Sequence, residues 1–384
     1  MRFLCATMVP GLWDGVKNND VAIRRFMDNM QNDPSALRTP AASVHRPRWI
    51  LNTLAVLFLL VTVAVSLYPS FIDAPDLAAL ERKVRQDNPG WNGNLVFGRD
   101  SAETSLFDFG GKAYANSVSL SGAGLRDLSA LRKMPFQSMR LFGMDGVSLD
   151  LLRGLRWMSQ VSLSIRDSRN MKSFAALESL PVAEVEVMDC PGFTDTLLLG
   201  GNLRSVHLVR TGVTRLDFRN PDLLEALTFS TDSRFADISQ IPRMTRLSYL
   251  NLDGQFSLDG VDLTPLAYLA SFALEHSEVE TVPALTPDIL SSICLSDCPN
   301  LKNLDFLNGK MVDMLYLKGC GDPEKLFSRL ANVRINTLVV REAHVTDLAF
   351  LRRIKGLSKV HFLNCTGLPE RINEPFVDVF VENI

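Results

Sequence analysis

Few residues of this 384-residue chain have the types and spacing that catalysis or metal binding requires. Glu184 and Glu186 form a carboxylate pair of the kind that a hydrolase acting on envelope polymers would use as acid and base. Both project from the same side of one expected strand, whereas separated acid and base roles need carboxylates across a cleft. Hydrolysis is therefore kept only as an alternative hypothesis.

The cysteines and histidines do not form a recognisable reactive group either. Cys294 and Cys298 are four residues apart, but we expect the first to face outward from a strand and the second to be buried beyond it, so that the two side chains diverge. His207 and His361 both take the outward middle position of an expected strand, with no partner that would complete a triad. The chain has no glycine-rich phosphate loop, G-x-S-x-G elbow, H-E-x-x-H motif or paired C-x-x-C. We expect no catalytic, metal-binding or cofactor-binding residues.

The dominant pattern is a repeated apolar-x-apolar pair. Thirteen copies follow one another at intervals of 19 to 24 residues: Val118/Leu120, Met139/Leu141, Val161/Leu163, Val185/Val187, Val206/Leu208, Leu227/Phe229, Leu250/Leu252, Phe272/Leu274, Ile293/Leu295, Leu315/Leu317, Leu338/Val340, Val360/Phe362 and Val379/Val381. A unit this short cannot close its own core, so neighbouring units must stack. The two apolar members lie on the same side of a strand and point inward, and the residue between them points outward. Twelve intervals of about 4.8 Å predict a surface roughly 60 Å long.

Several copies resemble the leucine-rich repeat family. The segments "LYLKGC" from Leu315 and "ICLSDCPNLKNL" from Ile293 follow its pattern well. Cys190, Cys298, Cys320 and Cys365 fall three residues after the second apolar member, where the family has Asn or Cys. The same position is otherwise occupied by Ala123, Met144, Arg166, Thr211, Asp232, Gln255, Ser277 and Ala343. The resemblance covers about residues 95–384 and implies an α/β solenoid, a horseshoe of about 13 short parallel strands, in which these cysteines form a structural ladder that bonds loop carbonyls.

The concave face of such a solenoid is the expected binding surface for a protein partner. Toward the C-terminus its outward positions hold cationic and aromatic side chains, which are common in binding hot spots. The predicted partner-binding residues are Tyr249, Tyr316, Lys318, Arg341, Lys359 and His361. Their charge favours an acidic partner surface.

An uncharged run lies between Arg48 and Asp73 and predicts a transmembrane helix over residues 49–72. Its apolar centre extends from Trp49 to Tyr68, two aromatic residues suited to the membrane interfaces. A helix of twenty residues is about 30 Å long, which matches a bilayer core. A cleaved signal peptide is the alternative, but the run starts far from the N-terminus and lacks a small-x-small cleavage site.

The segments on either side of this run have separate roles. Residues 1–48 form a tail. Within it, residues 20–31 predict a helix that docks a cytoplasmic partner, because Ile23, Phe26, Met27 and Met30 share one helical face. Residues 34–48 contain prolines and predict an extended linker. The alternative for 20–31 is a helix on the membrane surface or a disordered segment. Residues 73–94 predict a juxtamembrane helix, capped by Asp76, that covers the first repeat of the solenoid at 95–384.

The charges near the run bear on its orientation. Three arginines between residues 38 and 48 precede it and Asp73 and Asp76 follow it, which favours a cytoplasmic N-terminus and an extracytoplasmic solenoid. Three basic residues between 82 and 85 weaken this bias, and four buried thiols suit a reducing compartment. A cytoplasmic solenoid therefore stays open as the alternative.

Together these patterns predict a single-pass membrane protein that presents a leucine-rich-repeat-like solenoid for protein–protein recognition, without catalysis. A signalling relay that couples solenoid binding to the N-terminal tail is the main alternative within this class. The formal net charge of −3 offers no basic excess for nucleic acid.

Overall fold

A computed structural model describes residues 76–98, 117–232, 236–369 and 377–382. The chain divides into two compact units, Met1–Asp73 and Ala74–Ile384, and the description below concerns the second. The predicted tail at 1–48 and the predicted span at 49–72 lie outside the described residues. Within the described ranges, no helix is both long and apolar enough to cross a bilayer.

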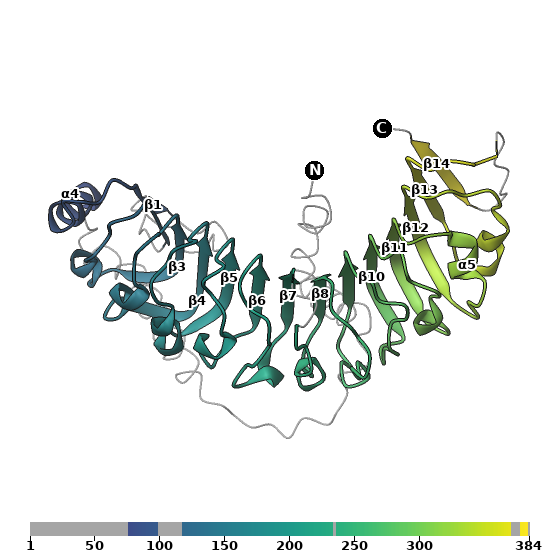
Figure 1. Cartoon of the computed structure of the whole chain (residues 1–384), viewed down its shortest axis with the longest axis horizontal. Helices are drawn as coiled ribbons and strands as arrows, with labels where there is room; N and C mark the ends of the chain where they lie inside the picture. Colours follow the sequence, from purple (N-terminus) through teal and green to yellow (C-terminus); the bar gives the residue numbers. More distant parts are fainter. Residues whose placement is uncertain (1–75, 99–116, 233–235, 370–376, 383–384) are drawn as a thin grey trace, which may run out of the picture. The chain divides into compact units, whose positions relative to one another are not determined.

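The described residues of the second unit form one sheet of fourteen strands that follow one another in sequence order (Figure 1). The strands are β1 Leu95–Gly98, β2 Ser117–Ser121, β3 Pro135–Phe142, β4 Arg156–Arg166, β5 Val182–Met188, β6 Ser205–Val209, β7 Ala226–Thr231, β8 Tyr249–Gly254, β9 Ser271–Glu275, β10 Ile289–Ser296, β11 Met311–Lys318, β12 Arg334–Arg341, β13 Lys359–Leu363 and β14 Asp378–Glu382. All neighbouring pairs from β2 to β14 are parallel. This is a solenoid of stacked repeats with one parallel strand to each repeat.

The register aligns the apolar pairs across the sheet. Leu250 pairs with Phe272, Phe272 with Ile293, and Ile293 with Leu315. These side chains are at most 1% exposed, and together with their counterparts in other strands they form one continuous core. Twelve of the thirteen predicted pairs take this inward register, so the periodicity predicted the sheet correctly.

The prediction was wrong for β4. There the pair that matches its neighbours is Leu163/Ile165, two residues later than the predicted Val161/Leu163. β4 is eleven residues long, and the ladder shifts register on both of its sides. Gln160 takes a positive φ of 61°, which breaks the regular alternation just before the pair. Because Val161 is also fully buried, burial alone does not reveal which apolar residues belong to the common register.

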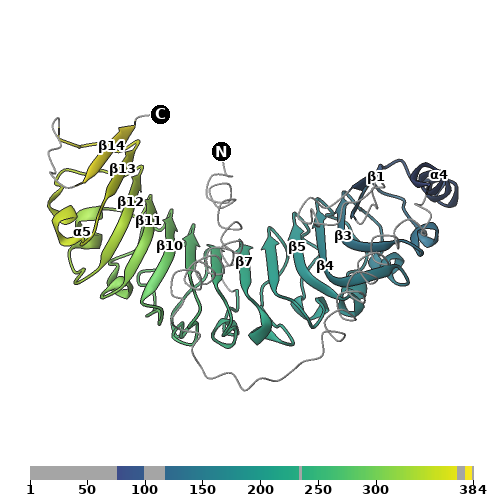
Figure 2. The ribbon, with the colours of Figure 1, turned by 180° about the vertical axis from the view of Figure 1, so that it is seen from behind.

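Short helical turns return the chain from one strand to the next. Figures 1 and 2 show that, within this unit, the strands line the inner side of a curve and the return segments lie outside it. The 3-10 turns are η3 Ser129–Leu131, η4 Leu149–Leu152, η5 Ala175–Ser179, η6 Thr196–Leu198, η7 Pro221–Leu223, η8 Ile241–Arg243, η9 Asp305–Leu307 and η10 Ala349–Arg353, and one return contains the short helix α5 Pro323–Phe327. The outward side of the strands is called the concave face below.

A helix and an antiparallel strand close the first edge of the sheet. β1 pairs antiparallel with β2, and the helix α4, Leu77–Asp87, lies beside η3. The Asp76 side chain caps α4 by accepting a hydrogen bond from the Ala79 amide. Val84 is fully buried, and the Trp91 indole donates to the Ser121 carbonyl at 2.8 Å. These contacts cover the apolar edge that the first repeat would otherwise expose.

Many strands end at a residue with left-handed backbone, two residues after the second inward side chain. Gly143, Asp189, His276, Asp297 and Glu342 all have φ values between 49° and 60° there. Their amides donate to the last strand residue of the next repeat, as from Asp297 to Lys318 at 2.6 Å. Glycine accepts this conformation without cost, whereas the other residues bring a side chain to the rim of the concave face.

Asn88 fixes the capping helix to the first repeat. Its side-chain amide donates to the carbonyls of Val84 and Asp127 at 2.8 and 2.7 Å, and its oxygen accepts from the amides of Arg126 and Asp127 at 2.7 and 2.8 Å. We expect Asn88→Ala to lower the free energy of unfolding by about 2–4 kcal/mol, because it leaves buried backbone groups unpaired. Urea unfolding measures the change. The matched control is Asn92→Ala, because Asn92 is exposed and its substitution should change the free energy of unfolding by less than about 0.5 kcal/mol. Equal effects of the two substitutions would show that the hydrogen bonds of Asn88 do not stabilise the contact between α4 and the first repeat.

Candidate functional site

Each strand places one outward residue between its two inward ones, and register aligns these residues into a central column on the concave face. From β2 to β14 the column reads Ser119, Arg140, Ser164, Glu186, His207, Thr228, Asn251, Ala273, Cys294, Tyr316, Val339, His361 and Phe380. The column is polar from β2 to β8 and mainly apolar or aromatic from β9 onward. The concave face therefore has two chemically different halves.

Hydrogen bonds between neighbouring strands occupy the polar half. The Glu186 carboxylate accepts from Ser164 Oγ at 2.7 Å and from two nitrogens of Arg166 at 2.6–3.1 Å. His207 Nδ1 lies 2.9 Å from Thr228 Oγ1, and burial lowers the pKa of this imidazole despite the nearby Glu186. An acid already held by a guanidinium and a hydroxyl is poorly placed to act as a hydrolytic base.

The half-buried Glu275 lies at the end of β9, beside this polar half. It accepts a hydrogen bond from Asn251 Nδ2 at 3.1 Å. Burial, reinforced by the nearby carboxylate of Asp253, raises the pKa of the Glu275 carboxyl above its ordinary value. Tyr249 lies on the same part of the face with Asn251 and Thr228 beside it, and burial raises the pKa of its phenol.

A row of ionisable side chains runs along the rim where β8 to β12 end, and is called the ionic row. It consists of Asp253, His276, Asp297, Lys318, Glu342 and Arg341. His276 Nδ1 lies 2.8 Å from Asp253 and its Nε2 lies 3.6 Å from Asp297. The Lys318 ammonium continues the row at 2.8 Å from Asp297 and 3.6 Å from Glu342.

The same contacts set the protonation of the ionic row. The hydrogen bond to Asp297 raises the pKa of Lys318. Burial opposes the charge of Asp297, but hydrogen bonds from Lys318 and Ser296 hold the pKa of its carboxyl below the ordinary value. Arg341 Nε donates to Glu342 at 3.1 Å. Two of the three predicted cationic residues, Lys318 and Arg341, are therefore already paired with acids of this chain.

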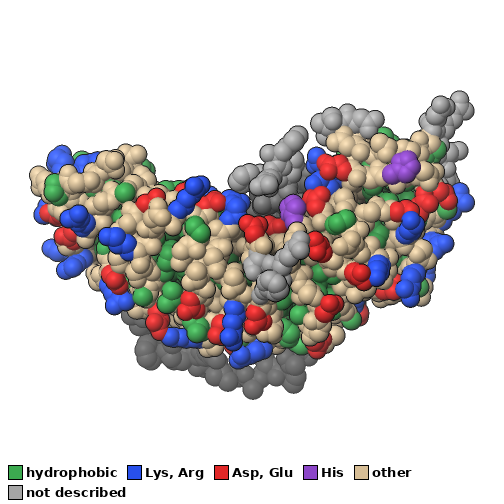
Figure 3. All heavy atoms as spheres, viewed as in Figure 1, with side chains coloured by type: hydrophobic (Ala, Val, Ile, Leu, Met, Phe, Trp, Pro, Cys, Tyr) green, Lys and Arg blue, Asp and Glu red, His purple; other side chains and the backbone are tan. Residues whose placement is uncertain are grey.

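The remaining predicted site residues lie along the face rather than in one cluster. Tyr316 and His361 belong to the central column, and Lys359 is exposed at the start of β13. The His361 ring stacks on Phe380 of the next strand, with centroids 4.7 Å apart and planes inclined by 11°. Tyr249 lies on β8, three strands before Tyr316. Figure 3 shows acidic and basic side chains interspersed over the described part of this view, without a large area of one sign.

The ionic row was not predicted, because only some of its members occupy the positions that flank the apolar pairs. His276, Asp297 and Glu342 are the left-handed residues beyond the strands. The signal available in the sequence was that each of these residues lies two positions after the second apolar residue of its pair. A positive φ turns their side chains toward neighbours that the strand alternation alone does not indicate.

The four predicted ladder cysteines make the same two contacts in their repeats. Cys190, Cys298, Cys320 and Cys365 each lie near the carbonyl two residues earlier and near the carbonyl of the second inward residue of the preceding strand, at sulfur–oxygen distances of 3.1–3.7 Å. Burial raises the pKa of Cys190 to about 11, so its thiol stays protonated and able to donate.

In the repeat of β4 the corresponding residue is Ser168 and not the predicted Arg166, because the inward pair is shifted by two residues. Ser168 is fully buried, its hydroxyl donates to the Arg166 carbonyl at 3.0 Å, and it accepts from the Met144 amide at 3.1 Å. The fully buried Ser277 holds this position after β9. A buried serine thus takes this position in two described repeats that lack cysteine.

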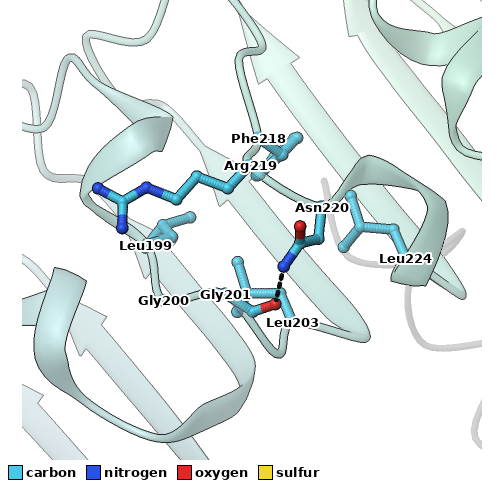
Figure 4. A pocket seen from close by; sticks show the side chains of 8 residues that line it. All are labelled: Leu199, Gly200, Gly201, Leu203, Phe218, Arg219, Asn220 and Leu224. Carbon is cyan, nitrogen blue, oxygen red and sulfur yellow. Dashed lines mark hydrogen bonds between the residues drawn. The ribbon is translucent and has the colours of Figure 1, made fainter.

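Two hollows among the described residues are small. Figure 4 shows a cavity of about 10 Å³ between two returns, where Asn220 Nδ2 donates to the Gly201 carbonyl at 2.7 Å. That volume holds at most one water molecule. A more open hollow of about 250 Å³ lies between the returns around Ile238 and Val261. Both are smaller than usual ligand pockets of about 300–1,000 Å³, and the described residues contain no group of three or more potential metal ligands.

Comparison with known proteins adds little to this geometry. No protein-family profile matches the chain, and no curated protein matches it. Among solved structures, it is similar to the crystal structure of an internalin from Listeria monocytogenes str. 4b F2365. The identity is 15%, the match covers 67% of this chain and 87% of that chain, and the TM-score is 0.28. The fold assigned here therefore rests on the strand register described above.

We expect Glu275→Gln to stabilise the protein at pH 7. The raised pKa means that the folded state binds more protons than the unfolded state between the ordinary and the raised value, so stability falls as pH rises through that window. Glutamine removes the buried charge and can still accept the Asn251 hydrogen bond. The gain in the free energy of unfolding should shrink as pH falls toward about 4, where the carboxyl is protonated in both states.

Urea unfolding of wild type and variant across this pH range measures the effect. Glu280→Gln is the control, because Glu280 is in an exposed ion pair with Lys302 that should contribute less than about 1 kcal/mol. A Glu275→Gln difference that stays constant with pH would show that burial of the charge is not its cause.

Proposed function

We propose that the second unit is a protein-recognition domain that binds its partner through the β9–β14 half of the concave face. The observation that carries the proposal is the change in the central column from hydrogen-bonded polar side chains to the group Ala273, Cys294, Tyr316, Val339, His361 and Phe380, called the apolar column. Phe380 is 44% exposed, and Tyr316, Val339 and His361 are half-buried.

The dimensions of the apolar column suit a folded partner. Six strands at about 4.8 Å spacing extend over about 24 Å. A standard interface buries about 800 Å² on each partner, which corresponds to a patch roughly 28 Å across. Tyr316 is the expected anchor, because tyrosine buries a large area at low entropic cost and can form a directed hydrogen bond.

The charges beside the apolar column support recognition by shape and apolar contact more than by an acidic partner. Lys318 and Arg341, on which the expectation of an acidic partner depended, are paired with Asp297 and Glu342. Lys359 pairs in register with Asp378 of β14. Two of the three predicted cations on this half are therefore balanced by acids of the chain itself.

Binding is also favoured over hydrolysis as the role of this face. Glu186, one of the two candidate acids, is engaged by Arg166 and Ser164, and Glu184 lies on the same strand. No second carboxylate faces the pair across a cleft among the described residues, because the sheet is open on this side. We therefore propose a non-catalytic function.

Photo-crosslinking tests the binding surface. A benzoyl-phenylalanine placed at Tyr316 should form an adduct with the partner in cells, whereas the same group at Leu197, an exposed apolar residue of η6 on the outer side, should not. A Tyr316→Ala/Arg341→Ala double variant should weaken partner binding by roughly tenfold or more, which corresponds to about 1.4 kcal/mol. Equal adducts at both positions, or unchanged binding by a double variant with wild-type circular dichroism, would exclude this half of the face.

We also propose that residues 49–72 anchor the chain in a membrane, with the N-terminal tail in the cytoplasm and the solenoid outside. The support is the uncharged run itself and the acidic residues that follow it directly. In sealed cells carrying an epitope after Ile384, external protease should digest the solenoid while a label on the tail stays protected. Survival of the epitope until lysis would place the repeats in the cytoplasm and favour the alternative orientation.

A further inference from the structure

Three large apolar side chains are exposed in consecutive repeats, at the edge of the sheet where the strands begin. Tyr268 is 71% exposed, Ile289 69% and Met311 43%. They are called the apolar edge row. Three exposed large apolar side chains in adjacent repeats differ from single exposed ones, which are ordinary on a protein surface.

The three side chains occupy the same position of their repeats. Ile289 pairs in register with Met311. Tyr268 lies three residues before Ser271, and Ser271 pairs with Ser292, which lies three residues after Ile289. Ile289 and Met311 are therefore one strand spacing apart, about 4.8 Å at the backbone, and Tyr268 holds the equivalent place in the turn that precedes β9.

Their exposure does not result from a lack of core to enter. The next residue in each repeat, Leu269 or Leu290 or Val312, is at most 1% exposed and fills the inward position. The alternation of the strand directs Ile289 and Met311 to the opposite side. The apolar edge row is thus fixed outward by the same register that builds the core.

Arginines occupy the same position in the two repeats that flank the row. Arg334 pairs in register with Met311, and Arg246 lies three residues before Tyr249, the register partner of Ser271. Both side chains are exposed, and neither is in an ion pair with a described residue. Asp288 is exposed next to Ile289, so the centre of the row does not attract an acid. The arginines at the two ends of the row do attract acids, and four strand spacings place these arginines about 19 Å apart.

The spacing of the row distinguishes between a helical and an extended partner. Apolar residues at i, i+4 and i+7 of a helix lie at about 0, 6 and 10.5 Å along its axis, close to the 0, 4.8 and 9.6 Å of the row. Alternate residues of a strand lie at about 0, 6.7 and 13.4 Å, so the third would miss Met311 by roughly 4 Å. Two acids 19 Å apart correspond to about 13 helical residues.

We propose that the apolar edge row docks an amphipathic helix of a partner protein, with three apolar residues at i, i+4 and i+7 and an acidic residue about one turn beyond each end. The apolar residues contact Tyr268, Ile289 and Met311, and the acidic ones pair with Arg246 and Arg334. This surface is separate from the apolar column: along β11, Met311 and Tyr316 are about 17 Å apart. The proposal does not depend on binding at the column.

The test uses the full-length chain and two fluorescent peptides of about 18 residues, built from alanine and glutamine to favour a helix. One carries leucines at i, i+4 and i+7 with a glutamate three residues outside each end leucine, and the other has lysines in place of the glutamates. Fluorescence anisotropy should show the glutamate peptide binding roughly tenfold or more tightly than the lysine peptide. Arg246→Glu/Arg334→Glu should reverse that preference.

Substitution in the row should act on both peptides. Ile289→Ser should weaken each by roughly tenfold, whereas Met158→Ser, which removes an exposed methionine on β4 outside the row, should change neither. Equal binding of the two peptides, no binding up to about 1 mM, or equal effects of the two serine variants overturns the proposal. A Tyr316→Ala/Arg341→Ala variant should bind both peptides normally, so failure here leaves the proposed function of the apolar column unaffected.

Discussion

The parallel register of the inward pairs is the constraint on which the rest of this unit depends. One repeat buries its apolar pair only when the next repeat aligns its own pair beside it, as Leu250, Phe272 and Ile293 do. A register slip of one residue would turn every inward side chain outward. The inward positions are consequently restricted to apolar residues, while the outward positions are free to vary in chemistry from strand to strand.

This division determines what kind of site the fold can build. Each strand contributes one central outward residue at about 4.8 Å from the next, so the concave face is a linear array rather than a pocket. The rim adds a second array through the left-handed residues, whose backbone direction brings His276 between Asp253 and Asp297. Such arrays suit an extended partner surface, and the two hollows described above are smaller than a usual ligand pocket.

The periodicity of the sequence was sufficient to predict the strands, their order and twelve of the thirteen inward pairs. It failed at β4, because Val161 is as fully buried as Leu163 and only the ladder shows the two-residue shift. The candidate binding residues lie on β8, β11, β12 and β13, and the pairing of Lys318 and Arg341 with acids was not foreseen. The salt bridge from Lys318 to Asp297 depends on a positive φ at Asp297, which the apolar pattern does not encode.

The energetics of desolvation explain why the two halves of the concave face should differ in binding. In the polar half a partner would have to compete with bonds already made, such as those from Arg166 and Ser164 to Glu186, and an exchange of equivalent hydrogen bonds contributes little. In the apolar column each square ångström of apolar area removed from water contributes about 25 cal/mol. His361 is already fixed against Phe380, so its immobilisation adds little entropic cost. Recognition is therefore most favourable where the column changes from charged and polar side chains to mainly apolar and aromatic ones, from β9 onward.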